Sequence, residues 1–215
     1  MSAAEVNLWS EAEHVRDYLS RRASFPWRDT AYQHLMELLP PAPRRVLDLG
    51  CGDGQVVGRV VDAYPAVDAI ACDFSPEMLG RARERFADAA NVTVVAHNLD
   101  DPLPEEWGVF DAIVSAFAIH HVVDERKRAL YGEVFGHLAP GGVFCNLEHV
   151  ASPTPELHEA FLTSIGQTLD DDDPSNKLAS VEVQLGWLRD IGFAQVDCFY
   201  KWREIGLLAG IRPGA

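Results

Sequence analysis

The sequence reads VLDLGCGDG over residues 46–54, and this stretch decides the fold. A short apolar strand runs into Gly50, Gly52 and Gly54, and a helix is predicted directly after them over 54–63. Glycines let the backbone turn tightly and approach a ligand, and a helix N-terminus presents free N–H groups. Ligands of open α/β sheets bind beyond the carboxyl ends of the strands, where this loop lies. The stretch therefore predicts a ligand site at the end of a buried strand.

The spacing of the glycines separates two kinds of ligand. The dinucleotide fingerprint G-x-G-x-x-G would place its third glycine at position 55, which is Gln55 here. Instead the third glycine is Gly54, and Asp48 precedes the loop. A carboxylate this close opposes a pyrophosphate but attracts an ammonium or sulfonium group. The loop therefore favours a cationic ligand, with nucleotide phosphate binding or a ligand-free turn as alternatives.

A second acidic residue, Asp73, ends the next predicted strand, 23 residues after Gly50. An acidic side chain at this place accepts hydrogen bonds from the hydroxyls of a ribose. The alternative is a solvated loop aspartate. Combined with the glycine loop, Asp73 indicates a ligand with an adenosine part.

The rest of the chain alternates short apolar runs with amphipathic segments. Strands are predicted over 45–49, 68–73, 92–97, 111–116, 142–148, 194–201 and 204–211. Helices are predicted over 54–63, 76–88, 125–138, 155–169 and 180–190. This order indicates an α/β fold with a seven-stranded, mostly parallel sheet, helices on both faces and an antiparallel last strand. Residues 1–43 are expected to form an N-terminal helical lid, and residues 44–215 the ligand-binding domain.

The amino-acid composition limits the classes of binding partner and the cellular compartment that we expect. The formal net charge of −15 repels a phosphate backbone, which favours a small-molecule substrate over a long nucleic acid. The four cysteines form no C-x-x-C pair and the eight histidines show no zinc spacing, so we expect no metal ion. No signal peptide and no apolar run of about 18 residues is visible, so we expect a cytoplasmic protein without a membrane segment. The oligomeric state is left open, with a homodimer as one alternative.

Four motifs occur in order: VLDLGCGDG at 46–54, DFSPEML at 73–79, FDAIVS at 110–115 and LAPGGVF at 138–144. They resemble the motifs of the class I S-adenosylmethionine-dependent methyltransferase superfamily, from about Arg45 to the C-terminus. The resemblance implies a Rossmann-like sheet, S-adenosylmethionine as cofactor and methyl transfer as activity. More narrowly, VSAFAIHH at 114–121 and VEVQLGWLRDIGF at 181–193 resemble a small subgroup related to carboxy-S-adenosylmethionine synthase.

The resemblance also implies roles for single positions. Asp48 and Gly50, with Gly52 in the same loop, would hold the amino-acid end of the cofactor, and Asp73 its ribose. The adenine would lie among Phe74, Met78, Asn98 and Leu99, and Ser115 would flank the sulfonium, with Ala116 beside it. Asn98 stands where the family usually has aspartate, and its carbonyl can accept the same hydrogen bond from the adenine amino group. From the N-terminal segment, which carries Trp9, Tyr18 and Trp27, Arg28 would meet the cofactor carboxylate.

Candidate bases cluster beyond the fourth and fifth predicted strands. We predict His120, His121 and Glu148 as catalytic residues, with His149 as a further candidate. His120 is preferred because it follows the fourth strand most directly; packing or helix capping is the alternative for any one of these side chains. The adjacent His120 and His121 are expected to point to opposite faces of an extended chain. The four aspartates at 170–173 are expected to form a solvated loop.

Three functions therefore remain. The leading one is methyl transfer to a small molecule, whose acceptor atom can be oxygen, nitrogen, sulfur or carbon. The second is an enzyme of the carboxy-S-adenosylmethionine or tRNA-modification kind, which needs an arginine in a segment that has none between Arg128 and Arg189. The third is a non-catalytic module that binds S-adenosylmethionine.

Overall fold

A computed structural model describes residues 9, 11, 13, 15, 16, 19 and 27–214. They form a seven-stranded sheet in the order β3-β2-β1-β4-β5-β7-β6. The strands are β1 (Arg45–Leu49), β2 (Asp68–Asp73), β3 (Val92–Ala96), β4 (Phe110–Ala116), β5 (Leu138–His149), β6 (Ala194–Trp202) and β7 (Ile205–Ile211). The helices are α2 (Trp27–Glu37), α3 (Gln55–Ala63), α4 (Pro76–Arg85), α5 (Asp124–His137), α6 (Pro155–Ser164) and α7 (Val181–Ile191). Short 3₁₀ turns are η2 (Glu105–Trp107), η3 (Ile119–His121) and η4 (Leu169–Asp171).

The last strand is antiparallel to both of its neighbours. β1 pairs in parallel with β2 and β4, and β4 pairs in parallel with β5. β7 instead runs antiparallel between β5 and β6. Only Arg203 and Glu204 separate β6 from β7, and Arg203 takes the left-handed conformation (φ 51°) that closes this turn. The predicted Rossmann-like fold with an antiparallel last strand is therefore confirmed.

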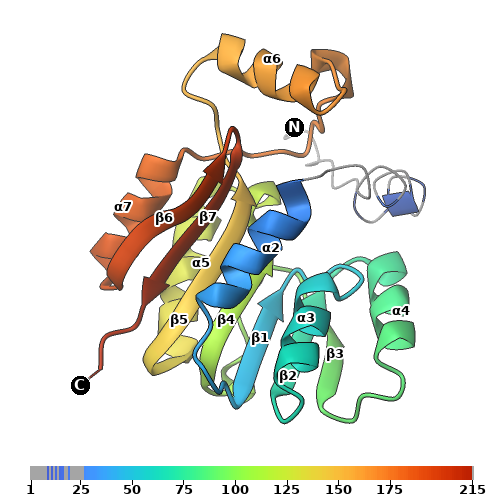
Figure 1. The fold of residues 1–215 in the computed structure, drawn as a ribbon, viewed down its shortest axis with the longest axis vertical. Coiled ribbons are helices and arrows are strands. Elements are labelled where there is room, and N and C mark those ends of the chain that lie inside the picture. Colours follow the sequence, from blue (N-terminus) through green and yellow to red (C-terminus); the bar gives the residue numbers. More distant parts are fainter. Residues whose placement is uncertain are drawn as a thin grey trace.

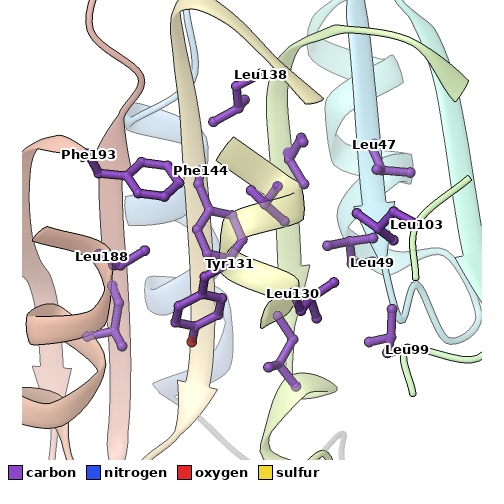
Figure 2. Close-up of a cluster of buried hydrophobic side chains, with 14 of the residues drawn as sticks. Leu47, Leu49, Leu99, Leu103, Leu130, Tyr131, Leu138, Phe144, Leu188 and Phe193 are labelled. Carbon is purple, nitrogen blue, oxygen red and sulfur yellow. The ribbon is translucent and has the colours of Figure 1, made fainter. Parts of the chain in front are cut away.

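Successive side chains of a strand point to opposite faces of the sheet, so alternate residues pack into the two main hydrophobic cores, one on each face. Leu47 and Leu49 of β1 pack with α5 and α7, whereas Val46 packs with α2 and α3. Figure 2 shows part of the first core, in which Tyr131 and Phe144 fill the space between sheet and helices. Figure 1 shows α2 and α3 crossing the near face of the sheet, with α5 behind it. Helices on both faces are confirmed.

Helix α2 is the longest described element of the N-terminal segment. It begins at Trp27 and buries Ala31, Tyr32 and Leu35 in the second core. This burial makes α2 part of the folded unit of the sheet. Tyr18 lies outside the described residues, and the boundary at residue 43 stays a prediction.

The carboxyl ends of the parallel strands meet at one edge of the sheet, and α6 stands above this edge (Figure 1). The sequence predicts a helix over 155–169, but α6 ends at Ser164 because Gly166 takes a left-handed φ of 75°. The segment from Gly166 to Ala179 then returns over the same edge. None of the helices in the described ranges has the length and apolar character needed to cross a bilayer.

Candidate active site

The glycine loop between β1 and α3 turns through left-handed conformations that favour glycine. Gly50, Gly52 and Gly54 have φ values of 66°, 55° and 81°. A Cβ atom on Gly50 would lie 2.2 Å from the Cβ of Ala118, so the loop also packs too closely for a side chain there. The backbone therefore confirms the tight turn that the sequence predicts at the end of β1.

Asp48 lies under this loop with an unpartnered oxygen. Its carboxylate is only 1% exposed, and Oδ2 accepts a hydrogen bond from the Val57 N–H at 3.1 Å. Oδ1 is buried without a hydrogen-bond partner. Burial raises the pKa of Asp48 to about 7, because water no longer stabilises its charge. A buried carboxylate oxygen that lacks a donor suits an ammonium group, which supplies both a donor and a positive charge.

Asp73 links the ends of β1 and β2. Its Oδ2 accepts a hydrogen bond from the Gly52 N–H at 2.9 Å, and Oδ1 accepts one from the Ser75 N–H at 2.8 Å. Burial raises the pKa of Asp73 above its ordinary value. Each carboxylate oxygen keeps a second lone pair, so the side chain can also receive two hydroxyl groups.

These residues surround a cavity that we call the glycine-loop cavity. It encloses about 880 Å³, including the part open to solvent, which suits a cofactor-sized molecule. It is lined by Trp9, Arg28, Tyr32, Asp48, Gly50, Cys51, Gly52, Asp53, Gln55, Val56, Asp73, Phe74, Met78, His97, Asn98, Leu99, Asp100, Ala116, Phe117, Ala118, His121 and Val122. All described lining residues therefore precede residue 123.

Nine of the ten predicted cofactor-binding residues line this cavity; Ser115 does not. Ser115 is fully buried and donates a hydrogen bond to the Leu49 carbonyl at 2.8 Å, which supports the loop from below. Asn98 lines the cavity, but its Oδ1 already accepts a hydrogen bond from the Asp100 N–H at 3.1 Å. The sequence reasoning missed Tyr32, Gln55, His97 and Asp100 among the lining residues, since no motif marks them.

A second cavity, which we call the histidine cavity, adjoins the first. It encloses about 1120 Å³, again counting space open to solvent. It is lined by Trp9, Trp27, Arg28, Phe117, His120, His121, His149, Phe161, Leu162, Ile165, Gln167, Asp171, Asp172, Asp173, Pro174, Asn176 and Ile205. The two cavities adjoin at four residues that line both of them: Trp9, Arg28, Phe117 and His121.

His120, which lines the histidine cavity, forms a buried pair with Glu148 behind it. His120 Nδ1 lies 2.6 Å from Glu148 Oε1, and Glu148 also accepts hydrogen bonds from the His149 N–H and from Asn146 Nδ2. Burial lowers the pKa of the His120 imidazole well below its ordinary value. Burial likewise raises the pKa of Glu148 to about 7. With an ionised Glu148 accepting from Nδ1–H, His120 keeps Nε2 as an unprotonated nitrogen.

The expectation that His120 and His121 point to opposite faces is wrong. Both lie in the 3₁₀ turn η3, not in extended chain, and their ring centroids are 3.9 Å apart. Both side chains therefore line the histidine cavity. Among the described residues, no group of three or more His, Cys, Asp or Glu side chains is arranged to hold a metal ion.

The aspartates of the segment 170–173 do not all form a solvated loop. Asp171, Asp172 and Asp173 line the histidine cavity, whereas Asp170 does not. The loop returns to the sheet edge after α6, which no local pattern reveals. The prediction of a solvated loop therefore holds for the exposed Asp170 and Asp171 and is wrong for the half-buried Asp172 and Asp173.

Glu204 is a functional candidate that the sequence analysis missed. It is 1% exposed and accepts hydrogen bonds from His149 Nε2 at 2.7 Å, His158 Nδ1 at 3.0 Å and Ser152 Oγ. Burial alone would raise the pKa of Glu204, but these hydrogen bonds bring it below its ordinary value. Glu204 thus fastens α6 and the end of β5 to the β6–β7 turn.

Comparison with known proteins assigns the family. Residues 46–142 match the family model of a methyltransferase domain. The demethylmenaquinone methyltransferase of Clavibacter sepedonicus is 30% identical over 192 residues, covering 81% of this chain and 76% of that protein. The chain belongs to the S-adenosylmethionine-dependent methyltransferase family.

Other relatives agree with this family. The methyltransferase chain is also 35% identical over 153 residues to the demethylmenaquinone methyltransferase of Thermus thermophilus, covering 68% of this chain and 66% of that relative. It therefore spans just under two thirds of that relative's length. An O-methyltransferase family protein from Burkholderia thailandensis shares the fold, with a TM-score of 0.72 and 22% identity over 96% of this chain and 62% of that one. The narrower likeness to carboxy-S-adenosylmethionine synthase is not confirmed by these relatives.

Proposed function

We propose that the protein transfers a methyl group from S-adenosylmethionine to a small molecule bound in the histidine cavity. The observation that carries this proposal is the junction of the two cavities at Phe117 and His121. One cavity has the glycine loop, the buried Asp48 and the half-buried Asp73, and the other has histidines and an apolar wall. A donor and an acceptor held in these two spaces would meet at the junction, which is the orientation that displacement of a methyl group requires.

The residues of the glycine-loop cavity fit S-adenosylmethionine part by part. Asp48, whose Oδ1 lacks a donor, would hold the ammonium group, and Asp73 would hold the ribose hydroxyls. Phe74, Met78 and Leu99 would enclose the adenine, and Arg28 would meet the carboxylate. Bound S-adenosylmethionine supplies an electrophilic methyl group on its sulfonium. The protein itself would orient the partners and exclude water.

His120 would accept the proton that the acceptor loses. Glu148 holds the ring through Nδ1, which leaves Nε2 as the basic nitrogen of a histidine on the cavity wall. The relatives from Clavibacter and Thermus are named for demethylmenaquinone, so a quinol is the first acceptor to test here. The apolar wall of Trp27, Phe117 and Phe161 suits an aromatic ring.

The test combines cofactor binding with product analysis. Calorimetry should show binding of S-adenosylmethionine and S-adenosylhomocysteine, with neither NAD nor ATP bound tightly. Incubation with labelled S-adenosylmethionine and a panel of quinols, catechols and amines should then give a methylated product. Preference for a nicotinamide nucleotide would contradict the proposal, and tight cofactor binding without any methylated product would favour a non-catalytic module.

The carboxylated cofactor is the second candidate. Arg28 is the one arginine or lysine among the described residues that line the two cavities, so it would have to hold an added carboxylate. Mass spectrometry of the cofactor recovered from the purified protein distinguishes S-adenosylmethionine from its carboxylated form, because the carboxylated form is heavier. We further propose a cytoplasmic location and no long nucleic-acid partner, in line with four free cysteines and a net charge of −15.

A further inference from the structure

His121 occupies the boundary between the two cavities. It lines both of them, and its ring packs against His120 and Trp9 with centroid distances of 3.9 and 5.2 Å. Its Nε2 atom is buried and has no hydrogen-bond partner. A buried nitrogen without a hydrogen-bond partner lowers the stability of the folded protein unless a ligand supplies the missing hydrogen bond. Because His121 lines both cavities, a hydroxyl or amine group of the methyl acceptor is the natural ligand of Nε2.

The protonation of the His121 ring is fixed by Ser175. His121 Nδ1 lies 3.0 Å from Ser175 Oγ and 3.4 Å from the Ser175 carbonyl oxygen. A carbonyl oxygen only accepts hydrogen bonds, so Nδ1 carries the proton. Burial and the neighbouring His120 both lower the pKa of His121, which keeps the ring neutral. In a neutral ring with the proton on Nδ1, Nε2 is an acceptor.

Asp173 completes the arrangement behind Ser175. The Ser175 hydroxyl donates to Asp173 Oδ1 at 2.7 Å, and the Ser175 N–H donates to the same oxygen at 2.8 Å. A hydroxyl hydrogen that is committed to a carboxylate is not available to His121, so Ser175 Oγ must accept from Nδ1–H. The three side chains thus form a chain of hydrogen bonds in which His121 donates to Ser175 and Ser175 donates to Asp173.

The loop that carries Ser175 is fastened to the turn that carries His121. The Lys177 N–H donates to the His120 carbonyl at 2.8 Å, and Lys177 Nζ donates to the His121 carbonyl at 2.8 Å. Buried Lys127 also donates to the Lys177 carbonyl. These bonds hold the two segments in register although Ser175 and His121 are 54 residues apart.

We propose that Ser175 and Asp173 are positioning residues that hold His121 with Nε2 unprotonated at the cavity boundary, so that Nε2 accepts a hydrogen bond from a hydroxyl or amine group of the bound methyl acceptor, through a proton other than the one that passes to His120. This inference rests on the proposed methyl transfer. It gives the segment 173–175 a role in orienting the acceptor, beyond closing the cavity. A histidine that only packs there has no need of a particular tautomer.

The tautomer can be measured without knowing the acceptor. Protein labelled with ¹⁵N in the histidine rings is observed by two-bond ¹H–¹⁵N correlation, and His121→Asn identifies the signals of His121. The wild type should show a protonated Nδ1 and an unprotonated Nε2. In Ser175→Ala the signals should move toward the opposite tautomer. Asp173→Asn should move them in the same direction, and it serves where Ser175→Ala folds poorly. Asp170→Asn is the control, since this exposed aspartate of the same segment does not line the cavity.

A wild-type ring protonated on Nε2 overturns the inference, and so do signals that neither Ser175→Ala nor Asp173→Asn changes. Once an acceptor is in hand, Ser175→Ala should lower kcat about tenfold or more, which is less than the 10²–10⁴-fold of a lost base. Ser175→Thr should restore most of it, and the Kd of S-adenosylhomocysteine should not change. A Ser175→Ala enzyme with wild-type kcat refutes the positioning role. Absence of any methyl transfer with the expected tautomer refutes the proposed function instead, so the two failures are distinct.

Discussion

His120 Nδ1 lies 2.6 Å from Glu148 Oε1, which joins the turn after β4 to the end of β5. Both side chains are buried, with exposed fractions of 8% and 1%. The turn that follows β4 is therefore fixed to the neighbouring strand by a pair of ionisable groups. His120 lines the histidine cavity, and its hydrogen bond to Glu148 means that the number of protons on the pair decides whether Nε2 is unprotonated.

Replacing His120 with alanine should remove the base that we propose for the reaction. We expect kcat to fall by roughly 10²- to 10⁴-fold, because the acceptor keeps its proton, while the Kd of S-adenosylmethionine stays nearly constant. His34→Ala, on the exposed side of α2, is the matched control. Steady-state kinetics, calorimetry and thermal melting together test this. A stable His120→Ala protein with full activity would move the assignment to His121 or His149.

The pH dependence of kcat/KM should follow the His120–Glu148 pair. Adding one proton to the pair blocks Nε2 in either arrangement: the ring becomes an imidazolium, or a protonated Glu148 donates to Nδ1 and Nε2 then carries the ring proton. Since burial raises the pKa of Glu148 to about 7, activity should be full above pH 7 and fall as the pH drops through it. Glu148→Gln should lower kcat but shift the acid limb well below pH 6.5, because burial lowers the pKa of His120 itself. Identical acid limbs in both proteins would contradict this prediction.

Asp73→Ala should weaken cofactor binding. The loss of hydrogen bonds to a charged group costs about 1.5–3 kcal/mol, or roughly ten- to hundredfold in Kd. The variant also releases the N–H groups of Gly52 and Ser75, so its melting temperature must be recorded. Asp68→Ala, at the exposed start of the same strand, is the control and should bind S-adenosylmethionine normally. An unchanged Kd in folded Asp73→Ala would refute the ribose assignment.

Gly50→Ala should impair both folding and cofactor binding. Its Cβ would lie 2.2 Å from the Ala118 Cβ, and the left-handed φ of 66° strains any other residue. Gly80→Ala is the contrasting variant, since a Cβ there meets nothing within 4 Å and Gly80 lies inside α4. Gly80→Ala should gain about 0.5–1 kcal/mol in the free energy of unfolding. Denaturant unfolding and calorimetry test the pair; equal effects would show that the loop tolerates a side chain.

Local sequence patterns predict the sheet and the glycine-loop cavity well. The strand, the glycines and the helix that build this loop are consecutive in the chain, and Asp73 follows one strand later, so short-range spacing is sufficient. The antiparallel last strand also follows from the short connection at 203–204. The sequence predicts that α6 continues to residue 169, but the helix ends at Ser164 because Gly166 takes a left-handed conformation.

The histidine cavity is harder to predict because distant segments build it. Glu204 meets His149 across 55 residues, and Ser175 meets His121 across 54. Nothing in the sequence next to Glu204 sets it apart from an exposed turn residue between two strands, although it is buried. The turn at His120 and His121 depends on packing against this distant loop, so an extended chain is a natural but wrong expectation.

The division of the lining residues along the chain has an evolutionary consequence. In the described chain, the glycine-loop cavity uses no residue after Val122, whereas Phe161, Leu162 and Ile165, in and after α6, line only the histidine cavity. The stretch that matches the family model, 46–142, likewise ends before α6. With the donor and acceptor sites as we propose them, selection can change residues 150–179 to accept new substrates while the residues around the glycine loop stay the same. The same division makes this segment a natural unit for recombination between relatives, and exchanging it should yield chimaeras that keep their donor and change their acceptor.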